Sequence, residues 1–152
     1  MVATNTAQKD NPKLNVRDWS GNQPTRIVID RNLRLNKELH IFDGTQKTIV
    51  ITEKKERGIN NVEYVQLPFN EQFYENLFNV LYKKEIQSII IEGGAKFLQN
   101  LINNSYWDEA RQFVGNVNFF NGIKAPTIEK LPSKRETISN SYLLTYYNLQ
   151  KI

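Results

Sequence analysis

The chain has 152 residues, 39% of them hydrophobic and 24% charged, which favours one globular domain with its own core and excludes a disordered chain. With no cysteine and one histidine, His40, the chain cannot form disulfides, cysteine nucleophiles or conventional multi-histidine metal sites. No apolar run or leader pattern indicates a membrane partner or secretion, so we expect a cytoplasmic protein. The net charge of +4 arises from basic residues spread along the chain rather than grouped with aromatic residues, so we expect a phosphate-bearing ligand and no nucleic acid, with plain solubility as the alternative.

The first half of the chain contains three segments that predict β-strands. Residues 26–30 and 47–52 are short β-branched runs ended by polar residues. Residues 62–67 alternate apolar and polar side chains, which predicts a strand with one exposed face, closed by Pro68. The first twenty-five residues contain turn signals and no convincing strand.

Helices and strands alternate through the middle of the chain. Asn70 is expected to cap a helix, because apolar residues recur at helical spacing from Phe73 to Leu81. Residues 88–91 form a continuous apolar run, typical of a central strand covered on both faces. A second helix is expected to follow Gly94, and late strands are expected around residues 110–117 and 142–149.

This order of elements predicts a mixed α/β fold. Alternating strands and helices favour a mostly parallel sheet flanked by helices. The two late strands have no helix between them, which favours an antiparallel C-terminal edge.

The segment Glu92-Gly93-Gly94 is the strongest local indication of a ligand site. Glycines let the backbone approach a ligand closely, and the free N–H groups of the following helix attract anions such as pyrophosphate. Ligands of open α/β sheets collect beyond the carboxyl ends of the strands. A tight turn that uses glycine for geometry alone explains the pattern equally well. Glu92 favours a ligand slightly, because a carboxylate after an apolar strand is costly to desolvate without a partner.

A polar cluster near the N-terminus is a second candidate. Thr4 or Thr6 is expected to cap a short helix and to place donors near a phosphate. Asp10-Asn11-Pro12 forms a rigid turn, and Arg17 offers a planar fork suited to phosphate. A capped turn followed by a surface arginine is the simpler explanation of the same residues.

Four blocks of sequence together resemble the reductase domain of the bifunctional riboflavin-biosynthesis deaminase/reductase, which has a dihydrofolate-reductase-like fold. In chain order they are TNTA…DNPKLNVR at residues 4–17, PTRIVIDRNLR at 24–34, IEGGA at 91–95 and WDEA at 107–110. Residues 116–127 fit the loop that follows the last block. Each block is modest by itself, but their combination and spacing are specific and cover essentially the whole chain.

The resemblance implies roles for individual residues. Thr6 and Asp10 would belong to the NADPH site, and Leu14 and Arg17 to the site for the ribosyl- or ribityl-phosphate substrate. Glu92 would contact the substrate, and Asp10 or Glu92 would assist proton movement as the catalytic carboxylate. The cofactor pyrophosphate would lie against the residues that follow the expected strand, namely Gly93, Gly94, Ala95, Lys96, Phe97, Leu98 and Gln99.

Two positions depart from the family pattern. Arg31 stands where the family usually has a small hydroxyl residue near the adenosine end of the cofactor. An arginine there can pair with the 2′-phosphate that distinguishes NADPH from NADH. Ala3 stands where the family normally has a glycine.

The implied reaction is hydride transfer from NADPH to C1′ of a ribosylamino-pyrimidinedione 5′-phosphate, giving the ribitylamino product, in a homodimer. The family's reductase domain begins with further strands and a helix. Residues 1–152 are therefore expected to be a single reductase-like domain that lacks its N-terminal portion and the zinc deaminase domain, and that is catalytically incomplete by itself. The alternatives are a nucleotide-binding module without turnover and a structural fragment that oligomerises through an exposed sheet edge.

Overall fold

The computed structural model describes residues 1–18, 20–118 and 120–149, and the chain divides into two compact units, Met1–Gly94 and Ala95–Ile152. The expectation of one reductase-like domain over residues 1–152 stays a prediction. Within the described ranges, no helix is long and apolar enough to cross a membrane.

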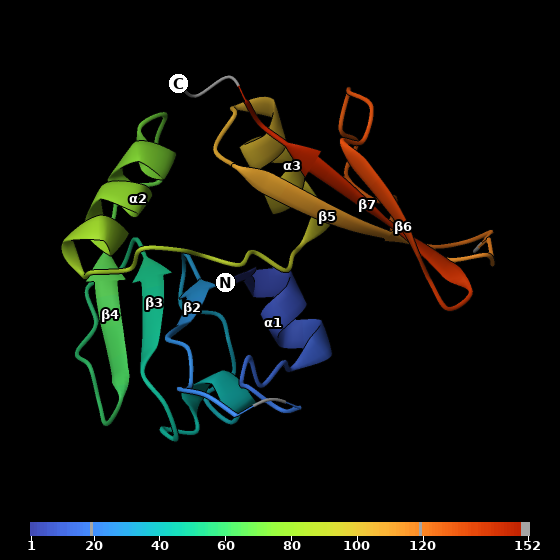
Figure 1. Cartoon of the computed structure of the whole chain (residues 1–152). Helices are drawn as coiled ribbons and strands as arrows, with labels where there is room; N and C mark the ends of the chain where they lie inside the picture. Colours follow the sequence, from blue (N-terminus) through green and yellow to red (C-terminus); the bar gives the residue numbers. More distant parts are fainter. Residues whose placement is uncertain (19, 119, 150–152) are drawn as a thin grey trace. The chain divides into compact units, whose positions relative to one another are not determined.

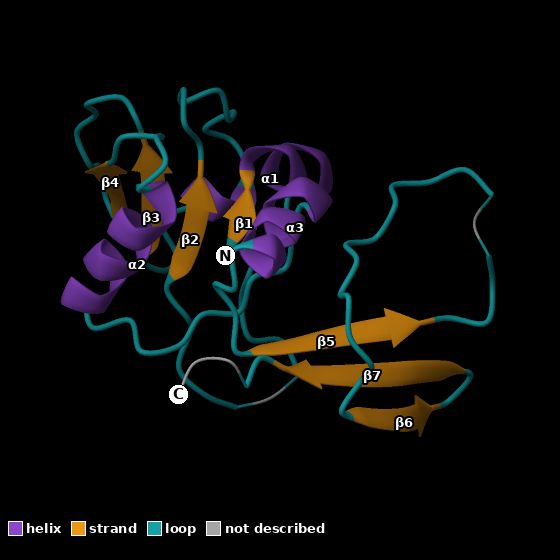
Figure 2. Cartoon of the chain, turned by 90° about the horizontal axis from the view of Figure 1, so that it is seen from above, coloured by secondary structure: helices purple, strands orange, loops and turns teal. Residues whose placement is uncertain are grey.

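The first unit contains a four-stranded parallel sheet with the strand order β1-β2-β3-β4 (Figures 1 and 2). The strands are β1 (Val2–Ala3), β2 (Arg26–Ile29), β3 (Thr48–Thr52) and β4 (Val62–Gln66). Every residue of β2 and β3 is buried, as expected for β-branched runs in the middle of a parallel sheet. The three strands predicted in the first half of the chain are therefore confirmed.

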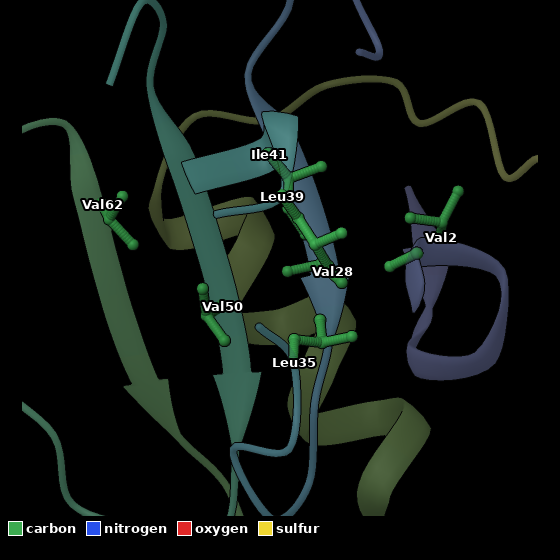
Figure 3. Close-up of a cluster of buried hydrophobic side chains, with 8 residues drawn as sticks. Val2, Val28, Leu35, Leu39, Ile41, Val50 and Val62 are labelled. Carbon is green, nitrogen blue, oxygen red and sulfur yellow. The ribbon is translucent and has the colours of Figure 1, made fainter. Parts of the chain in front are cut away.

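The core of this unit lies on one face of the sheet, where apolar side chains of the strands meet those of the β2–β3 connection (Figure 3). Val28 and Val50 are fully buried there. Alternation along the strands puts Ile27 and Ile49 on the opposite face, where they are also buried. The buried members of the cluster are Val2, Ala7, Val28, Leu35, Leu39, Ile41, Val50 and Val62.

Two α-helices belong to the first unit, α1 (Thr4–Asp10) and α2 (Phe73–Lys83), and a short 3-10 helix covers His40–Phe42. The expected caps are wrong in both α-helices. Ala3 is the N-cap of α1, and the hydroxyl of Thr4 instead donates to the carbonyl oxygen of Ile29 at 2.6 Å. Helix α2 begins at Phe73, and Asn70 organises the preceding turn by accepting a hydrogen bond from the Gln72 N–H.

Residues 88–91 were predicted to be a central strand, and this is wrong in the structure. They belong to no strand, and Ile90 is 78% exposed. Strand β1, also absent from the prediction, has only two residues and forms a single parallel bridge, Val2 to Gly93, just after this run. The Met1 amino group donates to the carbonyl oxygen of Ile90, and the Glu92 N–H donates to that of Met1. The run lies beside the short outer strand of the sheet, and the exposure of Ile90 shows that it is not covered on both faces.

The second unit contains α3 (Ala95–Asn103) and a three-stranded antiparallel sheet with the order β5-β7-β6 (Figure 2). The strands are β5 (Glu109–Val114), β6 (Lys134–Ile138) and β7 (Ser141–Tyr147). Their pairing confirms the antiparallel C-terminal arrangement and the mixed α/β class, although these strands form a sheet of their own. Strand β6 was not predicted, because its exposed sequence KRETI has no apolar alternation. Phe119, in the loop expected near Gly122, lies outside the described residues.

Candidate functional site

A cavity of about 1010 Å³ in the first unit brings together four residues that the sequence placed in the candidate site. Asp10, Leu14 and Arg17 line it from the segment that follows α1, and Glu92 lines it from the segment before the glycine pair. The two segments are far apart in sequence. Their convergence on one cavity is the main structural observation about this site.

The loop after α1 is fixed by backbone and amide hydrogen bonds. Asn11 has a left-handed conformation (φ 42°) and ends α1, and its side-chain oxygen accepts a hydrogen bond from the His40 N–H at 2.8 Å. Leu14 also has a positive φ, 45°. The buried amide of Gln46 donates to the carbonyl oxygens of Leu14 at 3.0 Å and Pro24 at 2.9 Å. The path of the loop that carries Leu14 and Arg17 is therefore determined by the β2–β3 connection.

Arg26 holds that β2–β3 connection in place. Its side chain is 2% exposed and donates to Asp43 Oδ1 at 2.6 Å, to the carbonyl oxygen of His40 at 2.8 Å and to the Thr45 hydroxyl at 3.3 Å. The guanidinium holds the pKa of the Asp43 carboxyl well below its usual range. Arg26 Nε is buried without a hydrogen-bond partner.

Sequence reasoning missed Arg26, Asp43 and Gln46. The available signal was Arg26 itself, a charged residue at the start of an apolar run that predicts a doubly covered strand. Such a residue needs a buried partner. Local pattern could not identify that partner, which lies 17 residues away.

Thr6 packs against the glycine pair. The peptide bond between Gly93 and Gly94 is cis, and Gly93 has φ 148°. A Cβ atom at Gly94 would lie 3.0 Å from Thr6 Oγ1, and one at Gly93 would lie 3.3 Å from it. The two glycines therefore permit a close approach of α1 that a larger residue would disturb.

Arg31 lies at the carboxyl edge of the parallel sheet and does not line the cavity. It makes a two-point contact with Glu53, with Nε donating to Oε2 at 2.9 Å and Nη2 donating to Oε1 at 3.3 Å. Its guanidinium also lies 5.4 Å from the centre of the Phe69 ring. The hydrogen bond from Arg31 lowers the pKa of Glu53 below its ordinary value.

The remaining predicted cofactor residues belong to the second unit, where α3 begins at Ala95. Its first turn includes Lys96 and no acidic residue, and the N–H groups of a first turn have no partner within their own helix. Phe97 and Leu98 follow and are half-buried. The Gln99 amide is engaged with the backbone of Thr127, accepting from its N–H at 2.8 Å and donating to its oxygen at 3.1 Å.

No group of three or more His, Cys, Asp or Glu residues in the described part of the chain could hold a metal ion. The functional groups at the candidate site are the carboxylates of Asp10 and Glu92, the guanidinium of Arg17, the hydroxyl of Thr6 and backbone N–H groups. This set suits a phosphorylated polyhydroxyl ligand, whose phosphate pairs with arginine and whose hydroxyls donate to carboxylates.

Comparison with known proteins matches this chain to reductases of riboflavin biosynthesis. It is 28% identical over 145 residues to the 2,5-diamino-6-ribosylamino-4(3H)-pyrimidinone 5′-phosphate reductase of Archaeoglobus fulgidus, covering 84% of this chain and 65% of the relative. It is 29% identical over 124 residues to the riboflavin biosynthesis protein RibD of Aquifex aeolicus, covering 75% of this chain and 33% of that protein. The chain thus spans less than two thirds of the length of these relatives.

A solved structure supports the same grouping. The deaminase/5-amino-6-(5-phosphoribosylamino)uracil reductase of Thermotoga maritima superposes with a TM-score of 0.76 at 25% identity, over 95% of this chain and 43% of that one. The riboflavin biosynthesis reductase Rib7 of Saccharomyces cerevisiae shares the fold, with a TM-score of 0.67 at 18% identity, over 82% of this chain and 69% of that one. The model of the RibD C-terminal domain matches residues 1–119. The chain therefore belongs to the RibD C-terminal domain family, with the dihydrofolate-reductase-like fold of its reductases.

Proposed function

We propose that this chain is the NADPH-dependent reductase of a ribosylamino-pyrimidinedione 5′-phosphate and yields the ribitylamino product in riboflavin biosynthesis. The single observation that carries the proposal is the cavity on which Asp10, Leu14, Arg17 and Glu92 converge. Family membership adds the reaction class, since the Archaeoglobus relative carries the name of a reductase of such a phosphate.

Arg17 is the proposed partner of the substrate phosphate. Its planar guanidinium can donate two parallel hydrogen bonds to a phosphate, and Lys13 lines the same cavity and adds positive charge. Leu14 lines the same cavity and offers the substrate an apolar contact. The left-handed conformation of Leu14, held by Gln46, sets the direction in which the chain continues toward Arg17.

Asp10 and Glu92 are the proposed carboxylates of the reaction. Both line the cavity, one from the end of α1 and the other from the segment before the glycines. Their oxygens can accept hydrogen bonds from ribosyl hydroxyls and orient C1′. One of them, in its protonated form, can donate a proton to the substrate nitrogen when C1′ of the ring-opened imine accepts the hydride.

The residues present fit a nicotinamide dinucleotide, which when bound supplies the hydride for C1′. Gly93 and Gly94 keep the backbone free of side chains beside Thr6, and the first turn of α3 offers N–H donors without a competing acidic residue. We place the pyrophosphate on this run, from Gly93 to Gln99. Arg31 is the proposed partner of the 2′-phosphate that makes the cofactor NADPH.

We further propose that the reductase acts as a cytoplasmic homodimer. Phe113, Ile138 and Tyr147 fall on one face of the antiparallel sheet by their register, and they are 67%, 46% and 42% exposed. The register puts Glu109, Arg111, Lys134 and Glu136 on the same face, so the apolar side chains support a mixed apolar and charged interaction surface. The second copy of this chain is the proposed partner.

NADPH binding by the purified chain tests the proposal. We expect calorimetry to show binding that prefers NADPH over NADH and that is lost in Gly94→Val, because the new side chain would collide with Thr6. Gly21→Val is the matched control, since nothing lies within 4 Å of a Cβ atom at Gly21. Circular dichroism establishes that each variant is folded.

A turnover assay with the pyrimidine phosphate then separates the remaining alternatives. Binding followed by NADPH oxidation supports the reductase. Binding by a folded chain without turnover indicates either the nucleotide-binding module or a reductase domain that is catalytically incomplete by itself. A folded chain that binds no dinucleotide contradicts the proposed function.

A further inference from the structure

We propose that Glu53 determines how strongly the cofactor site discriminates between NADPH and NADH, because its carboxylate competes with the 2′-phosphate for Arg31. The inference rests on the proposed function. It concerns a residue to which neither the sequence pattern nor the family comparison gives a role. It also makes the preference for NADPH a balance between two side chains rather than a property of Arg31 alone.

The backbone fixes Arg31 and Glu53 beside each other. The carbonyl oxygen of Arg31 accepts two hydrogen bonds at 3.0 Å, one from the Glu53 N–H and one from the hydroxyl of Thr52. Thr52 is fully buried at the end of β3. Since these contacts hold the two main chains together, the ion pair between Arg31 and Glu53 results from the fold and not from a chance meeting of two mobile side chains.

The pair lies where open parallel sheets bind nucleotides. Strands β2, β3 and β4 are neighbours in the parallel sheet (Figure 1). Arg31 follows β2, Glu53 follows β3 and Phe69 follows β4, so all three residues lie at the carboxyl edge of the sheet. Phe69 is half-buried and stacks on Phe73 at 4.3 Å, which fixes its ring beside the guanidinium. A cation held over an aromatic ring offers an adenosine phosphate a positive charge in a fixed place.

Glu53 occupies the donors that a phosphate would use. It takes hydrogen bonds from Nε and Nη2 of Arg31, which is the edge suited to two-point binding of an oxyanion. A 2′-phosphate must displace this carboxylate or bind beside it against a like charge. A 2′-hydroxyl is neutral and can donate to Glu53. Glu53 therefore opposes NADPH while it favours or tolerates NADH.

The expected size of the effect follows from exposure. The side chains of Arg31 and Glu53 are 53% and 38% exposed, so solvent and salt weaken their interaction. We expect Glu53→Gln to tighten NADPH binding about fivefold and to leave NADH binding unchanged or weaker. The positive charge of Lys54 also lowers the pKa of Glu53, so Lys54 is kept in every variant.

The test is calorimetry on the whole chain with NADPH, NADH, adenosine 2′,5′-bisphosphate and adenosine 5′-monophosphate. The two adenosine ligands report on the 2′-phosphate without any turnover. Glu56→Gln is the matched control, because Glu56 is an exposed acidic residue in the same connection and its carboxylate accepts a local hydrogen bond from the Arg57 N–H. We expect adenosine 2′,5′-bisphosphate to bind Glu53→Gln more tightly than it binds the wild type. Its affinity for Glu56→Gln should equal its affinity for the wild type.

Arg31→Gln completes the experiment. If Glu53 acts by competing for Arg31, the gain from Glu53→Gln disappears in the Arg31→Gln background. An equal gain in that background overturns the inference, and so does an unchanged ratio of NADPH to NADH affinity in Glu53→Gln while the wild type binds NADPH. Failure of the proposed function has a different signature, since then no folded variant binds any of the four ligands.

Discussion

The side-chain amide of Gln46 donates a hydrogen bond to the carbonyl oxygen of Leu14 at 3.0 Å, across 32 residues of sequence. Leu14 has φ 45°, a conformation that few residues other than glycine adopt without cost. The same amide nitrogen also donates to Pro24, so one buried side chain holds both ends of the loop that carries Arg17. Gln46 is thus a positioning residue for the proposed phosphate contact.

Replacing Gln46 by leucine removes the donor of two part-buried hydrogen bonds, those to the carbonyl oxygens of Leu14 and Pro24. We expect the free energy of unfolding to fall by about 2 kcal/mol and the affinity for ribose 5-phosphate to fall as the loop relaxes. Urea unfolding and calorimetry measure the two effects. Gln8→Leu, at an exposed position of α1, is the control. A Gln46 variant of unchanged phosphate affinity would show that the loop is fixed by other contacts.

The ion pair between Arg26 and Asp43 predicts a defined pH dependence. Because Arg26 lowers the pKa of Asp43 in the folded state, the carboxylate stabilises the fold at all pH values above its ordinary pKa of 3.8. That contribution is lost as the pH falls below 3.8 toward the depressed pKa. We expect Asp43→Asn to lower the free energy of unfolding by about 2 kcal/mol at pH 7, because the buried guanidinium loses its counter-charge.

The difference between the wild type and Asp43→Asn should be equal at pH 7 and pH 5 and should shrink at pH 3. Urea unfolding at the three values measures it. Comparing the two proteins at each pH cancels the titration of the other carboxylates. A difference that does not depend on pH would mean that Asp43 acts through its shape and not its charge.

The parallel strands were predictable because burial on both faces leaves a mark in the sequence. Strands β2 and β3 are β-branched throughout their apolar positions, and the structure buries all their residues. The same composition misled at residues 88–91, since an apolar run carries no information about how many partners its segment has. Strand β6 failed for the opposite reason, because an exposed strand needs no apolar face.

The site was predictable where its residues lie in one short segment. The cluster from Asp10 to Arg17 and the glycine pair could be recognised by their local chemistry. Their convergence on one cavity could not, because it depends on where two distant segments lie in space. The anchors Arg26 and Gln46 were missed for the same reason, since whether a polar side chain is buried is set by long-range packing.

Arg17 should dominate the affinity for phosphate. We expect Arg17→Ala to weaken ribose 5-phosphate binding about 10- to 100-fold, and Arg17→Lys to have an intermediate effect, because lysine keeps the charge but not the two-point geometry. Arg34→Ala is the control, since Arg34 is also exposed and does not line the cavity. Calorimetry at low and high salt measures the effect. Equal losses in the two alanine variants would point to overall charge rather than to a contact.

The exposed face of the antiparallel sheet should determine the oligomeric state. Phe113 is 67% exposed, and its register partner on β7 is Leu143, which also pairs with Glu136 of β6. An arginine in place of Phe113 would bring an unpaired charge into a desolvated interface while leaving the isolated chain almost as stable, because the side chain is not part of the core. We expect sedimentation velocity to show a dimer for the wild type and a monomer for Phe113→Arg. Tyr82→Arg, on α2 and 79% exposed, should remain dimeric. A monomeric wild type, or a dimer that survives Phe113→Arg, would rule out this face as the interface.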